Sequence, residues 1–156
     1  MEEGDSNLMA SDGIFDIFTV SSLFQKLQHD HGRVAAAPYD RWAAIDFILT
    51  ADSLRHWATI DADNGSCSLV VQICRDLAIR SKHWRARLSQ VKDSKATNVG
   101  FQFGVFQPDA FQVGNLIVVL KGDAEQYFGS EIGLEVLANE TLEFWRTWFA
   151  GRPTPE

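Results

Sequence analysis

The sequence predicts a mainly helical (mainly α) domain: an antiparallel four-helix bundle with a β-hairpin or small sheet inserted between its third and fourth helices. Apolar residues recur with helical spacing in four segments, and they alternate with small or polar residues near position 100. Of the 156 residues, 46% are apolar, which is ample for one core. A single domain is expected over 14–150, with an N-terminal tail at 1–13 and a C-terminal tail at 151–156.

Glycine and proline bound the first two predicted helices. Ile17 to His31 carries apolar residues at helical spacing and stops at Gly32. Pro38 suits the first position of a second helix, which continues from Tyr39 to Trp57 without another Gly or Pro. The face of this second helix that is expected to meet the core consists of Tyr39, Trp42, Ala43, Phe47, Leu54 and Trp57.

A third helix is predicted from a cap at Ser66 or Ser68 to about Leu88. Its apolar face consists of Val70, Ile73, Cys74, Leu77, Trp84 and Leu88. An adjoining polar strip, within about 60° around the helix, holds Asp76, Arg80, His83 and Arg87. The pattern leaves open whether this strip is exposed or is a buried structural network.

A β excursion is predicted after the third helix. Val99 to Val105 alternates apolar residues with Gly and Gln, and Leu116 to Leu120 is a continuous apolar run. Turn signals lie between the two segments, so a hairpin or small sheet is expected at about 99–121. A last helix, from about Ser130 to Phe149, then returns to close the bundle.

The chain is expected to be a cytoplasmic protein that neither crosses a membrane nor contains a disulfide. It has no run of roughly 18 consecutive apolar residues, and its first residues lack the basic then apolar order of a signal peptide. Cys67 and Cys74 lie on one predicted helix at a separation of roughly 10 Å, which exceeds the reach of a disulfide. Both are expected to be core thiols.

No metal site and no cofactor are expected. The sequence lacks a Gly-rich phosphate loop, a G-x-S-x-G elbow and a C-x-x-C pair, so nucleotide hydrolysis, serine hydrolysis and zinc chemistry have no support. His29 and His31 are a close pair, but residues two apart diverge by about 200° on a helix. Asp61 and Asp63 lack the ligand spacing of a calcium loop.

Positive charge is concentrated in one segment of an acidic chain. The segment from Arg75 to Lys95 contains seven basic and two acidic residues, so its net charge is +5. Because the net charge of the whole chain is −7, the remaining residues together carry −12. This basic stripe could hold an RNA backbone, could face an acidic patch on a partner or second copy, or could be a solvated helix face. The residues expected to contact nucleic acid are Arg80, Lys82, Arg85 and Arg87.

Asp46 falls on the apolar arc of the second helix. A buried carboxylate needs a partner, because burial of an uncompensated charge costs several kcal/mol. Antiparallel packing of the second and third helices would place Arg80 within about one turn of Asp46. We therefore expect a contact between Asp46 and Arg80, which either fixes the helix register or supports a ligand site; the remaining alternative is that Asp46 is simply exposed.

His83 is the histidine best placed for acid–base chemistry, because it shares the polar strip with Asp76 and Arg80. A histidine beside an arginine could cleave RNA without a metal: the histidine would transfer a proton and the arginine would stabilise the charged phosphorane. The candidate catalytic residues are thus Arg75, Asp76, Arg80 and His83. The alternative is a structural histidine near a helix end.

Two segments carry a resemblance to known proteins. Residues 43–47 (Ala-Ala-Ile-Asp-Phe) with Leu54 and Trp57, and residues 73–78 (Ile-Cys-Arg-Asp-Leu-Ala) leading to Ser-Lys-His at 81–83, look like parts of a group of uncharacterised bacterial and prophage helical proteins. More distantly, the predicted bundle resembles the HEPN superfamily. Members of that superfamily are often RNases or substrate-binding subunits in toxin and phage-defence systems.

The HEPN signature is an arginine, often followed by a polar residue, and then a histidine after four to six intervening residues. Arg75 and Asp76 match its opening, whereas His83 follows Arg75 after seven intervening residues and Arg80 after two. The resemblance implies a groove, formed across a dimer interface, in which Arg75 or Arg80 meets His83. It is also compatible with a non-catalytic member, so enzyme status stays open.

Three functional classes follow from the sequence. The first is a HEPN-like, metal-independent RNase, and the second is a non-enzymatic nucleic-acid or ligand-binding bundle of the same fold. The third is an acidic interaction protein, such as a phage-encoded inhibitor, that uses the −12 charge outside the basic stripe. RNA, a second copy of the chain or a larger protein would be the corresponding partner.

Overall fold

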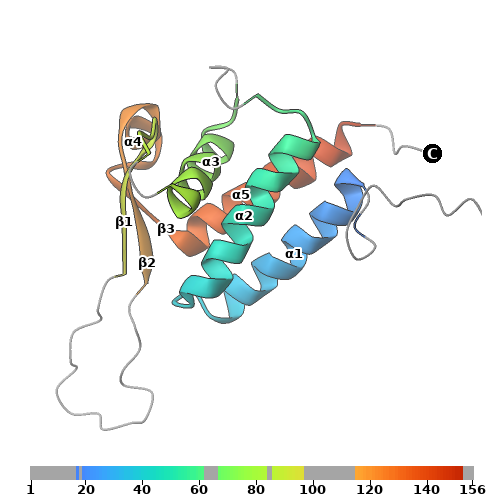
Figure 1. Ribbon diagram of the computed structural model, residues 1–156, viewed down its shortest axis with the longest axis horizontal. Helices are drawn as coiled ribbons and strands as arrows, with labels where there is room; N and C mark the ends of the chain where they lie inside the picture. Colours follow the sequence, from blue (N-terminus) through green and yellow to red (C-terminus); the bar gives the residue numbers. More distant parts are fainter. Residues whose placement is uncertain (1–16, 18, 62–66, 84–85, 97–114, 153–156) are drawn as a thin grey trace, which may run out of the picture.

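The computed structural model is mainly helical with a small antiparallel sheet, which confirms the fold class at that level (Figure 1). The residues that it describes are 17, 19–61, 67–83, 86–96 and 115–152. The helices are α1 (Val20–Ala36), α2 (Arg41–Trp57), α3 (Leu69–Lys82), α4 (Gly122–Phe128) and α5 (Leu134–Ala150). The strands are β1 (Val91–Ala96), β2 (Leu116–Leu120) and β3 (Glu131–Gly133). None of the described helices is long and apolar enough to cross a membrane.

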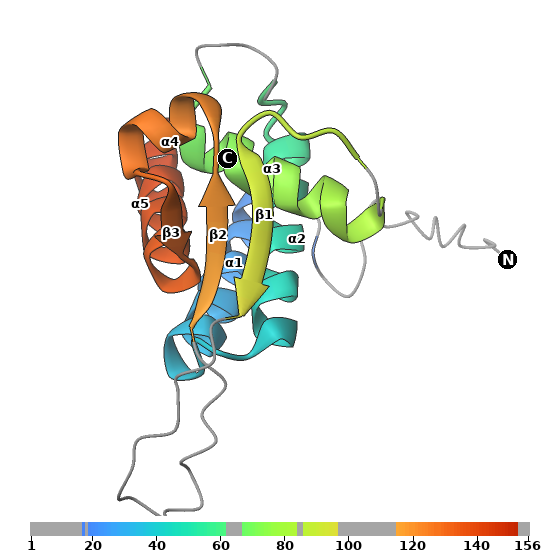
Figure 2. The same cartoon turned by 90° about the vertical axis from the view of Figure 1, so that its left-hand side faces the viewer.

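The longer helices pack on one another, and the sheet lies at one side of them. α1 contacts α2 and α5, while α3 contacts both α2 and α5. Figure 1 shows the sheet at the left, on the side of α3 that faces away from α2. In Figure 2, which is turned by 90°, the sheet lies in front of the helices. The strand order is β1-β2-β3 with antiparallel pairing throughout, and Val118 in the middle strand lies opposite Ser94 and Ile132.

One contiguous core fills the space between the helices and the inner side of the sheet. Trp145 on α5 and Phe47 on α2 are its largest fully buried side chains. Val118 and Ile132 contribute to it from the sheet. The ring of Phe144 stands edge-on to Trp145, with 5.2 Å between centroids. Burial of such large rings contributes strongly to stability, because each removes 150–250 Å² from water (about 4–6 kcal/mol at about 25 cal/mol per Å²).

α1 begins and ends later than the sequence pattern predicts. Its first residue is Val20, because Thr19 caps the helix: the Thr19 side chain accepts from the Ser22 backbone N–H, and the Ser22 side chain accepts from that of Thr19. The helix passes Gly32 and continues to Ala36, which brings Val34 into the core at 1% exposure. It ends where the residue before Pro38 is restricted to extended backbone.

α2 begins at Arg41 rather than at Pro38, because Asp40 caps it with bonds from two backbone N–H groups. The prediction of which residues of this helix face the core is wrong for three of the six residues. Ala43, Phe47 and Leu54 are buried, whereas Tyr39, Trp42 and Trp57 are exposed. Ala44, Ile48, Ala51 and Asp52, which lie outside the predicted face, are also buried, and Asp52 lies 3.8 Å from Lys82 at the end of α3.

The chain after α3 differs most from the prediction. α3 ends at Lys82, six residues before the predicted end, and β1 follows at Val91. Neither α4 nor β3 has a counterpart in the prediction, and β3 occupies the expected start of the last helix, so α5 begins at Leu134. The predicted strand at 116–120 is confirmed as β2, while the predicted strand at 99–105 lies outside the described residues.

Gln90 shows why the helical pattern does not continue to residue 88. The residue is buried, its backbone N–H donates to Asp76 on α3, and its side-chain oxygen accepts from the backbone N–H of Ala124 on α4. α4 starts at Gly122 with a φ of 61°, a conformation that favours glycine. Hydrogen bonds to distant residues thus override the local preference of His83 and of residues 86–88 for a helix.

Candidate nucleic-acid interface

Arg75 and Asp76 form a buried network in the middle of α3. Asp76 is 0% exposed, and its Oδ1 accepts from the Arg75 guanidinium at 3.0 Å. Its Oδ2 accepts from the backbone N–H groups of Gln90 and Val91 at 2.6 and 3.1 Å. The same guanidinium donates to Ser89 at 3.1 Å. These bonds fasten the start of β1 to α3, so of the two alternatives for Asp76 the structural network applies.

The remaining members of the expected polar strip are not on a common helix face, because α3 ends at Lys82. His83 is the residue that ends the helix, with its backbone N–H bonded to the carbonyl of Ile79. Arg80 and His83 are exposed, as is Arg87 in the segment that follows. Asp76 therefore does not share a surface with them.

The predicted contact between Asp46 and Arg80 is wrong, and so is the burial expected for Asp46. Its carboxylate instead accepts from the guanidinium of Arg33 on α1 at 2.6 Å, and its side chain is 47% exposed. This hydrogen bond raises the pKa of Arg33. The reason is the orientation of α2: Ala44 and Ile48 face α3, which turns Asp46 toward α1.

A surface rich in cations lies at the C-terminal end of α3 and in the segment after it. We call it the α3 cationic surface, and its described cations are Arg80, Lys82 and Arg87, with His83 next to Lys82 in the sequence. Cations are favoured at this end of a helix because they oppose its dipole. Lys82 lies 3.8 Å from the buried carboxylate of Asp52 on α2. Arg85, predicted to belong to the same group, lies outside the described residues.

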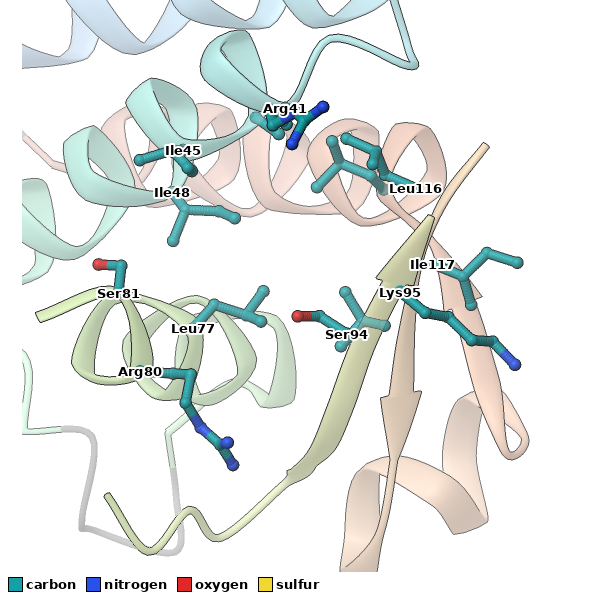
Figure 3. Close-up of a pocket in the computed structure, with 13 residues that line it drawn as sticks. Arg41, Ile45, Ile48, Leu77, Arg80, Ser81, Ser94, Lys95, Leu116 and Ile117 are labelled. Atoms are coloured by element: carbon teal, nitrogen blue, oxygen red, sulfur yellow. The ribbon is translucent and has the colours of Figure 1, made fainter. Parts of the chain in front are cut away.

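Further cations approach this region from other elements, around a hollow of about 260 Å³ between α2, α3 and the sheet. Arg41 comes from α2, Arg80 from α3 and Lys95 from β1 (Figure 3). Lys95 is paired with Glu131 on β3 at 2.6 Å. Arg41 carries no sequence signal of its own, because only the packing of α2 against α3 and the sheet places it at this hollow, across from Arg80.

The sequence pattern also does not predict the burial of two further carboxylates. Asp52 is 4% exposed and accepts from the Nε of Arg55 at 2.9 Å. Asp30 is 2% exposed and accepts from the hydroxyl of Thr50 at 2.6 Å, which links α1 to α2. The spacing of Asp52 and Arg55, three residues apart on a helix, was a usable signal for the first. Burial of Asp30 could be inferred only from the packing.

The close histidine pair diverges as expected. His29 has a side chain 74% exposed to solvent, whereas the Nε2 of His31 lies 2.7 Å from Oδ1 of Asn139 on α5. Among the described residues there is no group of three or more His, Cys, Asp or Glu that could hold a metal ion. Asp63, the second aspartate of the predicted loop, is outside those residues.

The two cysteines are free and differ in burial. Cys74 is buried and Cys67 is half-buried. Desolvation raises the pKa of Cys74 to about 12 and also raises the pKa of Cys67. Because the thiolate is the reactive form, we expect Ellman's reagent at about pH 8 to react slowly with Cys67 and to reach Cys74 only after unfolding in guanidinium. Prompt reaction of both thiols in the folded protein would contradict this expectation.

Comparison with known proteins finds no match for this chain, whether among family models, curated proteins or solved structures. Function therefore has to be inferred from the side chains themselves. The described geometry offers an exposed group of cations at the end of α3, a neighbouring hollow with Arg41 at its edge, and a buried Arg75–Asp76 pair that holds the fold together.

Proposed function

We propose that this protein binds RNA through the α3 cationic surface and does so as a HEPN-like helical bundle that does not cut the strand. The observation that carries the proposal is the exposure of Arg80 and Lys82 at the C-terminal end of α3, and of Arg87 in the segment that follows it, in a chain whose net charge is −7. Cations gathered on one surface of an acidic body attract a polyanion locally while the remaining surface repels it.

The choice of RNA comes from the distant resemblance of the bundle, and of its segment from Arg75 and Asp76 to His83, to HEPN proteins. The packing of α1, α2, α3 and α5 on one another supports a HEPN-like bundle, and Arg75 and Asp76 lie on α3 with His83 directly after it. Phosphate contacts by Lys and Arg side chains supply affinity that depends little on sequence. The expected ligand is therefore a single-stranded or looped RNA bound mainly through its backbone.

Binding without cleavage is supported by the surroundings of Arg75 and His83. The Arg75 guanidinium is already bonded to Asp76 and Ser89. The ring of His83 is exposed and has no hydrogen bond to another side chain within the described residues. Catalytic histidines are held in place by a third group, and transition-state charge is met by preorganised donors. One copy of this chain does not bring such groups together around His83 in its described part.

Removal of two charges from the α3 cationic surface is expected to weaken RNA binding. The double variant Lys82→Ala/Arg87→Ala should bind a fluorescein-labelled single-stranded RNA several-fold less tightly in anisotropy titrations. The slope of log K against log salt should fall in magnitude by about 1.4, because each lost phosphate contact on a single strand contributes about 0.7.

The matched control is Arg33→Ala/Arg146→Ala, which removes the same charge from α1 and α5. This variant should retain both the affinity and the salt slope of the wild type. Equal loss in the two double variants would show that net charge alone governs binding and would overturn the assignment to the α3 surface. The alternative of an acidic inhibitor stays a prediction, which copurification with a basic protein partner would test.

A further inference from the structure

The hollow between α2, α3 and the sheet is lined mainly by aliphatic side chains. Its apolar lining is entirely aliphatic among the described residues: Ala44, Ile45, Ile48, Leu77, Leu116, Ile117, Val118 and Leu134. Figure 3 shows Ile48 on α2 facing Leu77 on α3, with the strands closing the remaining side. A surface hollow lined in this way accommodates an alkyl chain better than a nucleobase, which needs aromatic or guanidinium planes to stack on.

The size of the hollow limits its occupant to a small molecule. Its volume is about 260 Å³. An apolar cavity of about 150 Å³ accepts benzene, and pockets for drug-sized ligands begin at roughly 300 Å³. A chain of medium length, with its polar end in solvent, fits between these limits.

The edge of the hollow determines the charge of that polar end. None of the described residues lining it is acidic, although the whole chain is. Arg41 lies at the α2 end beside Leu116 and has no ion pair with another described residue. Lys95 is already paired with Glu131, and the guanidinium of Arg80 points away from Ile48. Arg41 is therefore the cation best placed to meet an anionic head group.

We propose that the hollow binds a medium-chain aliphatic carboxylate, with its chain between α2, α3 and the sheet and its carboxylate on Arg41. A guanidinium matches a carboxylate by two parallel hydrogen bonds, which favours this head group. The site goes beyond RNA binding and does not rest on it. Arg80 belongs to the α3 cationic surface and also lines the hollow, but Lys82 and Arg87, whose removal tests RNA binding, are not among the described lining residues.

The test uses octanoate as the probe, with titration calorimetry on the full chain. Octanoate should bind, octan-1-ol should bind at least about fivefold more weakly, and acetate should not bind measurably. Arg41→Met, which keeps an unbranched flexible side chain but removes the guanidinium and its charge, should weaken octanoate binding by about five- to tenfold, the range of a partly exposed charged hydrogen bond. Arg33→Met, an exposed arginine on α1, is the matched control and should bind octanoate like the wild type.

A second variant tests the chain-binding part. Leu116→Trp places a large ring in the hollow and should abolish octanoate binding while RNA binding is retained, which separates the two sites. Arg41→Met alone decides the question if Leu116→Trp does not fold. The proposal is overturned if the wild type does not bind octanoate, if octan-1-ol binds equally well, or if Arg41→Met binds octanoate like the wild type.

Discussion

Asp76→Ala is expected to lower the free energy of unfolding by about 3–5 kcal/mol, the range for removing one partner of a buried charged pair. The substitution leaves the Arg75 guanidinium without its carboxylate and leaves the backbone N–H groups of Gln90 and Val91 without their acceptor. Urea denaturation monitored by tryptophan fluorescence would measure the loss as a shift of the midpoint.

The matched control for this substitution is Asp46→Ala. Asp46 also bonds an arginine, but the pair is exposed, so the variant should unfold close to the wild-type midpoint. A wild-type midpoint for Asp76→Ala would mean that Asp76 does not fasten β1 to α3. Its carboxylate would then be available for another role.

The second large effect is expected from Phe47→Ala, which should cost about 3–5 kcal/mol of stability, as is usual for truncating a buried aromatic ring. Phe47 is 0% exposed in the centre of the core. Trp42→Ala removes a larger ring from the same helix but should change stability by no more than about 0.5 kcal/mol, because Trp42 is 70% exposed. Guanidinium denaturation of both variants would measure the difference.

This pair of variants also tests the rotation of α2 about its axis. The hydrophobic pattern alone assigns both rings to the core face of the helix. A large loss for Trp42→Ala and a small one for Phe47→Ala would mean that α2 is rotated relative to the described structure.

The sequence predicts the long helices well and their surroundings poorly. Apolar spacing is a local property, so it finds α1, α2, α5 and the run that forms β2. It does not show that α2 is covered on two sides, by α1 and α3, so the pattern places Trp42 on the core face and omits Ile48. Apolar spacing also cannot show that Gln90 forms hydrogen bonds with α3 and α4. These bonds hold the chain in the position where β1 begins, so α3 is shorter than the pattern predicts.

The same limit applies to the candidate site. The basic residues of the stripe are visible in the sequence, but the sequence leaves their exposure open, and the structure shows that Arg80, Lys82 and Arg87 are exposed. The predicted partner of Asp46 is wrong, because the true partner depends on which helix packs against each face of α2. The approach of Arg41 to the hollow could not be predicted, because it requires residues about 40 positions apart to pack together.

Incubation of labelled RNA with the purified chain in EDTA, followed by native and denaturing gels, tests the central claim most directly. The expected result is a complex on the native gel, weakened by Lys82→Ala/Arg87→Ala, and intact RNA on the denaturing gel for both the wild type and His83→Ala. Cleavage by the wild type that is lost in His83→Ala would contradict binding without catalysis. No complex even at low salt would contradict RNA binding itself.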